Sequence, residues 1–291
     1  MICLLAVILD IVLGEPRRFH PLVGFGNWAN WLEQRLNTGE LWQGILALIL
    51  AVSPFVLFAW LLSEIWIIEV VLLYIAIAPR SLSEHAWAVQ SNLNDLDAAR
   101  QQVSKIVSRD TKNLDAQGIT RATIESVLEN GNDAVFAAIF WYLLAGLPGL
   151  VLYRLTNTLD ALWGYRNERF LHFGWAAARL DDALNLIPAR LTALSYACVG
   201  NFATAVDCWY KQASSWYSPN AGPVMAAGAG ALQVTLGESA HYHGQIKNRP
   251  TLGTGNPPTA NDIGRAVELI HRALGLWLII IALYIFVNWT F

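Results

Sequence analysis

Two long runs without a charged residue limit what this chain can fold into. Leu41–Ser63 contains 23 consecutive uncharged residues and Ala273–Phe291 contains 19, most of them apolar. A helix of about 20 apolar residues crosses the hydrocarbon core of a lipid bilayer. The composition agrees, because only 14% of the 291 residues are charged, whereas roughly 25% are charged in soluble domains. We therefore expect an integral membrane protein.

Shorter apolar segments predict that the chain enters the membrane several times. Residues 1–14 form an apolar run that contains Asp10, which indicates a short membrane segment or a buried helix. Residues 65–78 follow Leu41–Ser63 after a minimal turn, so 41–79 are predicted to form a transmembrane hairpin. The expected fold class is all-α: a polytopic integral membrane protein with about four to five membrane segments, re-entrant or buried helices and a helical cytoplasmic insertion.

The positive charges predict which segments face the cytoplasm. All 19 Lys and Arg residues lie in segments 15–40, 80–133, 154–190 and 207–272. Cytoplasmic segments of membrane proteins are enriched in these two residue types. We therefore expect 80–133 to be a helical cytoplasmic insertion, 207–272 to be cytoplasmic loops, and 273–291 to be the last span.

This assignment is incompatible with a single membrane crossing at Ala134–Tyr153. A single crossing there would put two arginine-bearing segments on opposite sides of the membrane, against the charge distribution. The sequence Gly146-Leu-Pro-Gly breaks the segment in its middle, which favours a helical hairpin or a re-entrant element. The alternative is a true span, with Leu191–Val206 as the return. We favour the first interpretation, in which 134–206 are re-entrant segments that enclose the polar patch 154–190.

The stretch Tyr153–Arg190 is much more polar than the uncharged runs on either side of it. Charged and amide side chains are expensive to remove from water, so between apolar segments they need partners or a functional role. The residues concerned are Arg154, Asn157, Asp160, Arg166, Asn167, Glu168, Arg169, Arg179, Asp181, Asp182, Asn185 and Arg190.

A second group of charged residues precedes this patch. Arg121, Glu125, Glu129 and Asp133 recur every four residues, so a helix would place them on one face. Mg²⁺ typically takes one or two carboxylates together with phosphate oxygens, which fits such a stripe. The alternative is a solvated acidic face that contains an Arg–Glu pair.

Three further patterns suggest sites, each with a structural alternative. Arg179, Asp182 and Asn185 lie at helical spacing, which indicates either a ligand site or a buried salt-bridge network. Arg109-Asp110-Thr111 could hold phosphate or metal, or could simply form a turn with an acidic cap. His20, next to a proline, is a loop histidine that could donate to a phosphate.

Several classes of function are disfavoured. The net charge of −3 gives no general basic field, so no nucleic-acid partner is expected. The sequence contains no P-loop, dinucleotide-binding glycine motif, GxSxG or HExxH. His241-Tyr-His243 offers two imidazoles without a third ligand nearby in sequence, so we do not expect a zinc site there.

Many short strings, in order along most of the chain, closely resemble the adenosylcobinamide-phosphate synthase family (cobalamin biosynthesis protein CobD/CbiB). No single string is a catalytic signature, but their number and register make the resemblance specific. The strings are Asp10…Gly14-Glu-Pro16 with His20-Pro21, Arg80-Ser-Leu-x-Glu84-His85, Arg109-Asp-Thr111, Arg121-Ala-x-Ile-Glu125…Glu129-Asn130…Asp133, Tyr153-Arg154…Asn157-Thr-Leu-Asp160, Gly164-Tyr-Arg166-Asn-Glu168-Arg169, Arg179-Leu-Asp181-Asp182…Asn185-Leu-Ile-Pro188-Ala-Arg190 and Ser218-Pro-Asn220-Ala-Gly222.

The resemblance implies an enzyme of vitamin B12 assembly in the bacterial inner (cytoplasmic) membrane, multi-pass and with its active site facing the cytoplasm. It would join adenosylcobyric acid to (R)-1-amino-2-propanol O-2-phosphate, using ATP and Mg²⁺, to form an amide. An unactivated carboxylate does not condense with an amine in water, so we expect an acyl phosphate intermediate. The lipid bilayer and other late membrane enzymes of the cobalamin pathway are candidate partners.

Under this resemblance the polar residues become candidate site residues. Catalysis needs Mg²⁺ on phosphate oxygens, arginines on phosphates and an acceptor for the amine proton. The catalytic candidates are Glu125, Glu129, Asp181 and Asp182, and the Mg²⁺ candidates are Glu129, Asp133 and Asp182. The candidates for binding substrate or phosphate are Arg109, Arg166, Arg179, Arg190, Asn157, Asn185 and His20.

Two functions from other classes remain as alternatives. A non-catalytic inner-membrane sensor or regulatory protein of the same fold is the first, and the retained acids and arginines argue against it. A transporter with buried ion sites is the second, and the lack of charges in the long spans disfavours it.

Overall fold

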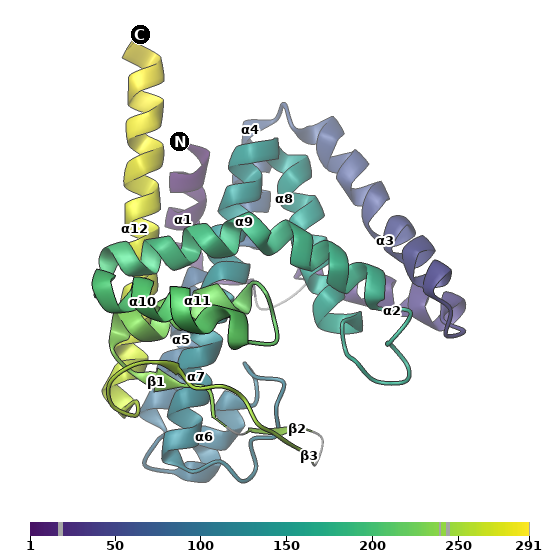
Figure 1. Cartoon of the computed structure of the whole chain (residues 1–291). Helices are drawn as coiled ribbons and strands as arrows, with labels where there is room; N and C mark the ends of the chain where they lie inside the picture. The colour runs from purple at the N-terminus through teal and green to yellow at the C-terminus, as the bar shows by residue number, and fades with distance from the viewer. Residues whose placement is uncertain (17–19, 239, 243–244, 291) are drawn as a thin grey trace. The chain divides into compact units, whose positions relative to one another are not determined.

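The chain is mostly helical in a computed structural model, which describes all residues except 17–19, 239, 243–244 and 291 (Figure 1). Side chains are not described for 239–247 and 289–291. The helices are α1 (Ile2–Leu13), α2 (Pro21–Leu36), α3 (Leu41–Leu62), α4 (Trp66–Ala76), α5 (Pro79–Ser91), α6 (Leu96–Val103), α7 (Ala116–Gly131), the π-helix η1 (Asn132–Phe136), α8 (Ala137–Trp163), α9 (Trp175–Val199), α10 (Phe202–Gln212), the 3-10 helix η2 (Ala213–Ser215), α11 (Ala221–Leu232) and α12 (Ala260–Thr290). The short strands are β1 (Thr235–Leu236), β2 (Ala240–Tyr242), β3 (Gln245–Lys247) and β4 (Leu252–Gly253).

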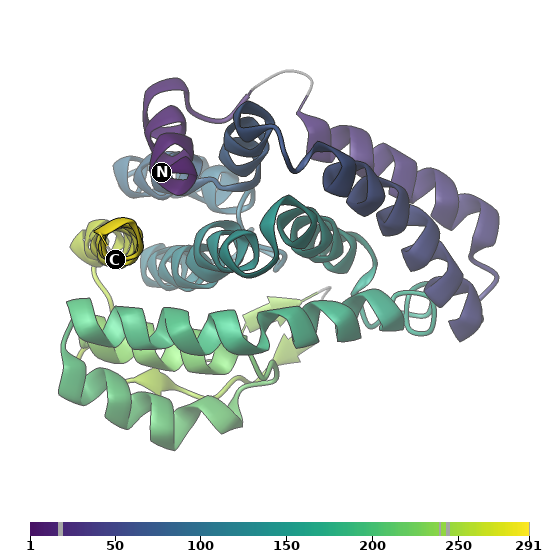
Figure 2. The same cartoon turned by 90° about the horizontal axis from the view of Figure 1, so that it is seen from above.

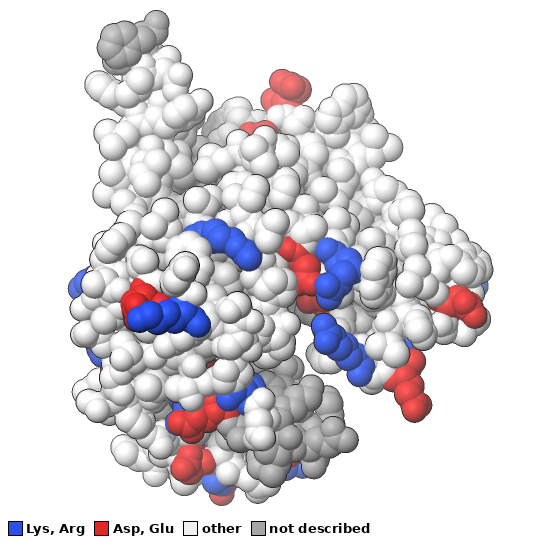
Figure 3. Space-filling model, viewed as in Figure 1, with Lys and Arg blue, Asp and Glu red and all other residues white. Residues whose placement is uncertain are grey.

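Within the part of the chain that the structure describes, four helical stretches are long and apolar enough to cross a membrane. They are Leu41–Leu62, Trp66–Ser91, Ala116–Trp163 and Ala260–Asn288. The predicted all-α membrane fold is therefore confirmed. Figure 3 shows no charged side chain among the described residues on the visible face of the C-terminal part of α12. This agrees with the uncharged sequence after Arg272.

The chain divides into two compact units. The first unit is Met1–Ala78 with Asp133–Leu186, and the second is Pro79–Asn132 with Ile187–Phe291. Each unit has its own buried apolar cluster, and each is described separately below.

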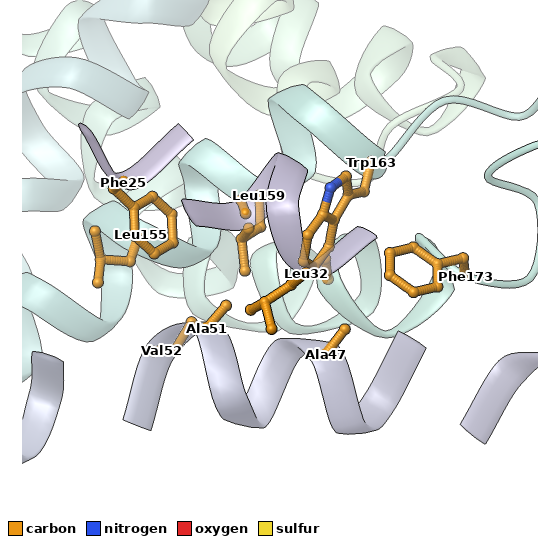
Figure 4. Close-up of a cluster of buried hydrophobic side chains, with 11 residues drawn as sticks. Phe25, Leu32, Ala47, Ala51, Val52, Leu155, Leu159, Trp163 and Phe173 are labelled. Atoms are coloured by element: carbon orange, nitrogen blue, oxygen red, sulfur yellow. The ribbon is translucent and has the colours of Figure 1, made fainter. Parts of the chain in front are cut away.

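The core of the first unit is formed by α2, α3 and α8 (Figure 4). Small residues of α3, Ala47 and Ala51, allow its backbone to lie close to Leu32 and Leu159. At the end of α8, Trp163 meets Phe173 edge-on, with ring centroids 5.0 Å apart. This contact links the end of α8 to the loop that precedes α9.

α8 is broken as the glycine and proline in its middle predict. Gly146 has φ 61°, and neither it nor Ala145 has helical dihedral angles. A Cβ atom built on Gly149 would lie 2.7 Å from the carbonyl oxygen of Trp141, eight residues earlier. In a straight helix those positions would be about 12 Å apart along the axis. The two halves of α8 therefore form a tight helical hairpin, which is the geometry that a re-entrant element requires.

The second unit contains a helix that we did not expect. Residues 207–272 were predicted to be loops, but α11 lies within them and is buried throughout, and α12 already begins at Ala260. Figures 1 and 2 both show α10 beside α11. A Cβ on Gly230 of α11 would come within 2.6 Å of the carbonyl oxygen of Thr204 in α10. The glycines and alanines of α11 permit this close packing, so its lack of large apolar residues does not indicate a loop.

Candidate functional site

A partly buried carboxylate, Asp181 on α9, is the centre of a polar network in the first unit. One of its oxygens accepts a hydrogen bond from the amide nitrogen of Asn157 on α8, at 3.2 Å. The other accepts from the amide nitrogen of Asn185, one turn further along α9, at 3.1 Å. Both amides were predicted from the sequence to lie in a substrate site, and the fold brings them to the same carboxylate.

The network continues along α8 on both sides of Asn157. Arg154 donates from Nη1 to the side-chain oxygen of Asn157 at 3.2 Å. Tyr153 is fully buried, and its hydroxyl oxygen lies 3.0 Å from the backbone carbonyl of Asp133 and 3.2 Å from the side-chain oxygen of Asn185, so these two acceptors share its one proton. Hydrogen bonds thus join a cation, two amides, a carboxylate and a phenol in one network.

The electrostatic surroundings disfavour a negative charge on Asp181. Burial is the largest cause, followed by the carboxylates of Asp133 and Asp160, and together they raise the pKa of Asp181 well above its ordinary value. The hydrogen bonds from Asn157 and Asn185 act in the opposite direction. A carboxylate with a raised pKa can accept and release a proton near neutral pH, as a general base must.

Other predicted residues lie in the same unit. Arg179 donates to Asp182 at 3.0 Å, and both side chains are partly exposed. His20 caps the start of α2, where its Nδ1 accepts from the backbone N–H of Leu22. Burial, opposed by Glu15, lowers the pKa of the imidazole, and the positive charge of Arg154 contributes to the decrease. Arg166 is exposed in the loop between α8 and α9.

A second polar cluster, in the second unit, is built around Glu125 of α7. Arg249 donates to both of its carboxylate oxygens, at 2.9 and 3.2 Å, and Arg109 donates to one of them. The backbone N–H of Gly237 donates at 2.8 Å to Oε1 of Glu125, the carboxylate oxygen that Arg109 does not contact. Glu129 lies one turn further along α7 and lines a small cavity of about 120 Å³ together with both arginines.

Arg190 occupies a third position, also in the second unit. Its Nη1 donates to the side-chain oxygen of Asn220 at 2.6 Å, and its Nη2 donates to the backbone carbonyl of Pro219 at 2.9 Å. Both of these acceptors belong to the Ser218–Gly222 loop.

Comparison with known proteins identifies the family. A family model described as CobD/Cbib protein matches residues 3–270. The protein named "Cobalamin biosynthesis protein CobD" of Chromobacterium violaceum is 56% identical over 288 residues, which cover 94% of this chain and 92% of the relative. The protein of the same name from Stutzerimonas stutzeri is 55% identical, covering 98% and 97%. The chain belongs to the CobD/CbiB family. No solved structure matches it.

Membership in the CobD/CbiB family confirms the resemblance drawn from the sequence, but it does not assign roles to individual residues. The fold brings Asn157, Asp181 and Asn185 into hydrogen-bond contact. Asp133 of the metal candidates lies in the first unit and Glu129 in the second. Among the described residues, no three His, Cys, Asp or Glu side chains are close enough to hold a metal by themselves. The side chains of His241 and His243 lie outside the described residues.

Two residues at these clusters were not predicted from the sequence. Tyr153 marked the start of the polar stretch but was not recognised as part of a site. Arg249 had no local signal, because it is 124 residues from Glu125 in the chain. Only the tertiary fold reveals that pairing.

Proposed function

We propose that this chain acts in cobalamin biosynthesis as an ATP-dependent ligase that forms an amide. The substrates are adenosylcobyric acid and (R)-1-amino-2-propanol O-2-phosphate, and the product is adenosylcobinamide phosphate. Membership in the CobD/CbiB family supports the pathway. The observation that carries the chemistry is Asp181, a partly buried carboxylate that accepts hydrogen bonds from two amides and lies near two further acids.

Amide formation requires a group that takes a proton from the amine. Transfer of the γ-phosphoryl group of ATP to the corrinoid carboxylate gives an acyl phosphate and ADP. The amine nitrogen then attacks the acyl carbon, the C–N bond forms, and the C–O bond to phosphate breaks. An ammonium ion must lose a proton before attack, and the attacking amine loses a second one. The carboxylate of Asp181 accepts a proton in this scheme, since its raised pKa suits transfer near neutral pH.

The donor sets present are compatible with Mg²⁺ bound together with a polyphosphate. Mg²⁺ usually takes one or two carboxylates and completes its coordination with phosphate oxygens and water, so a cluster of three acids is not required. Glu129, next to Arg109 and Arg249 in the small cavity of the second unit, is such a carboxylate. When bound, the ion neutralises charge on the transferred phosphoryl group.

The proposed activity can be tested with the full chain purified in detergent. We expect ATP consumption and a corrinoid amide product, detected by mass spectrometry, only when adenosylcobyric acid, the aminopropanol phosphate and Mg²⁺ are all present. ATP-independent binding of the corrinoid without product would instead support the sensor alternative. Absence of ligation under these conditions would contradict the proposed function.

We further propose that the protein resides in the bacterial inner membrane with the polar stretch 154–190 on the cytoplasmic side. Glu168 lies exposed in the loop between α8 and α9, so a cysteine there can report on its location. In a chain whose three native cysteines are replaced by serine, Glu168→Cys should not react with an impermeant maleimide in intact cells. It should react in inverted membrane vesicles.

The matched control is Glu64→Cys, in the turn between α3 and α4, which we expect outside. This variant should react in intact cells. Labelling of Glu168→Cys from outside would show that the α8 segment crosses the membrane as a true span.

A further inference from the structure

An open cavity of about 540 Å³ is formed entirely by residues of the second unit. Its lining includes Arg190, Trp209, Tyr210, Trp216 and Tyr217. Pockets that enclose small molecules and cofactors typically measure about 300–1,000 Å³, so a mononucleotide fits within this volume. None of the aromatic residues was assigned a role in the reaction proposed above.

The cavity presents several aromatic rings to a ligand. Tyr210 at the end of α10 is 88% exposed and Tyr217 is 64% exposed, whereas Trp216 is buried. The rings of Trp216 and Tyr217 lie 5.1 Å apart at 31°. Exposed aromatic faces bind planar heterocycles by stacking, which contributes about 1–3 kcal/mol per base where it has been tested by alanine substitution.

A fixed positive charge lies in the same cavity. Two hydrogen bonds, to the side-chain oxygen of Asn220 and to the carbonyl of Pro219, orient the planar guanidinium of Arg190. Arginine binds phosphate oxygens through such a pre-oriented planar group.

The loop that carries these groups is closely packed and hydrogen-bonded. A Cβ atom on Gly222 would come within 2.3 Å of the carbonyl oxygen of Ala213, so only glycine allows this approach. The hydroxyl oxygen of Ser218 accepts a hydrogen bond from the backbone N–H of Ala221 at 3.1 Å. The positions of Trp216, Tyr217 and Asn220 are therefore set before any ligand arrives, which lowers the entropic cost of binding.

Trp216 and Tyr217 also line the small polar cavity that contains Arg109, Glu129 and Arg249. The guanidinium of Arg249 lies 5.3 Å from the centre of the Trp216 ring. The buried indole N–H of Trp216 makes no hydrogen bond to the described residues, and a buried donor of this kind normally has an acceptor. The aromatic cavity and the polar cavity therefore share Trp216 and Tyr217 as lining residues. The indole N–H of Trp216 is a hydrogen-bond donor that a ligand there could use.

We propose that the larger cavity binds the adenine nucleotide consumed by the ligase. The purine ring lies against Tyr210 and its aromatic neighbours, and Arg190 binds phosphate oxygens. The Mg²⁺ assigned above to Glu129 binds the polyphosphate from the adjoining small cavity. The inference rests on the proposed function for the identity of the nucleotide, whereas the stacking faces and the fixed cation come from the structure itself.

The test measures binding of the non-hydrolysable ATP analogue AMP-PNP, with Mg²⁺, to the full chain in detergent by isothermal titration calorimetry. Tyr210→Ala should weaken binding about 10-fold through loss of stacking. Arg190→Lys should weaken it by a similar factor, because lysine cannot reproduce the planar contacts. Two matched controls should leave the affinity unchanged. Phe202→Ala removes an exposed aromatic ring elsewhere on α10, and Lys211→Gln removes an exposed positive charge next to Tyr210 in sequence.

The outcomes separate this inference from the proposed function. If Tyr210→Ala and Arg190→Lys bind AMP-PNP as tightly as the unmodified chain, the nucleotide does not occupy this cavity, even though ligation by that chain would still support the ligase. If these variants instead raise only the KM for adenosylcobyric acid, the cavity belongs to the corrinoid and the inference is wrong. If the unmodified chain binds AMP-PNP through these residues but forms no amide, the cavity assignment stands and the ligase proposal falls.

Discussion

Asp181→Asn should reduce the rate of amide formation by roughly 10²–10⁴-fold, which is the usual contribution of general acid–base catalysis. Asparagine has nearly the same shape, and its side-chain oxygen can accept from one of the two amides, Asn157 or Asn185, while its NH2 group faces the other; it cannot accept the proton of the amine. The measurement is single-turnover ligation with saturating substrates. Asp97→Asn, on an acid that is 88% exposed in α6, is the matched control and should retain normal activity.

The pH profile distinguishes a base from a merely structural carboxylate. A general base works only when unprotonated, so kcat should fall as the pH drops through the pKa of Asp181. Burial, then Asp133 and Asp160, raise that pKa. Asp160→Asn removes one neighbouring negative charge, which makes ionisation of Asp181 easier and should move the acid limb to lower pH. An unchanged limb in Asp160→Asn, or normal turnover in Asp181→Asn, would show that Asp181 is not the base.

Glu125→Ala should destabilise the second unit by about 3–5 kcal/mol, because it leaves buried arginines without their carboxylate. The side chains of Glu125, Arg109 and Arg249 are only 5–7% exposed. We expect the apparent Tm in detergent, followed by tryptophan fluorescence, to decrease by on the order of 10 °C. Asp207→Ala is the control, since it breaks an exposed Lys211 pair that typically contributes less than about 1 kcal/mol.

A conservative variant separates this structural role from the catalytic role predicted for Glu125 from the sequence. Glu125→Gln keeps the hydrogen-bond acceptor for Gly237 and part of the contact with Arg249. Loss of activity at an unchanged Tm would indicate that the carboxylate takes part in the chemistry. A Tm of Glu125→Ala equal to that of Asp207→Ala would contradict the ion-pair assignment.

Several parts of the fold were predictable because their causes are local in sequence. The apolar run at Leu41–Ser63 became α3, and the run after Ala273 became part of α12. The break at Gly146–Gly149 was also predictable, since glycine and proline act on the backbone of their own segment. The depth of the hairpin was not, because it depends on contact between Gly149 and the carbonyl of Trp141.

The interpretation of 207–272 as loops failed for a physical reason. Alanine and glycine give a weak apolar signal, and the proline and asparagine at 219–223 indicate a turn. In the structure that turn ends where α11 begins, and the small residues are what allow α11 to pack closely against α10. Hydropathy along the chain does not report how closely two helices can approach.

The sequence by itself determined the membrane class, the family and the set of polar residues that needed partners, because these depend on residue types and their order. Only the tertiary structure decided the pairing of those residues. It put Asn157 and Asn185 on the two oxygens of Asp181, and it joined Glu125 to Arg249 across 124 residues. Helical spacing had grouped Glu125 with Glu129 and Asp133, but hydrogen bonds form between atoms that are close in space, and the fold alone fixes those distances.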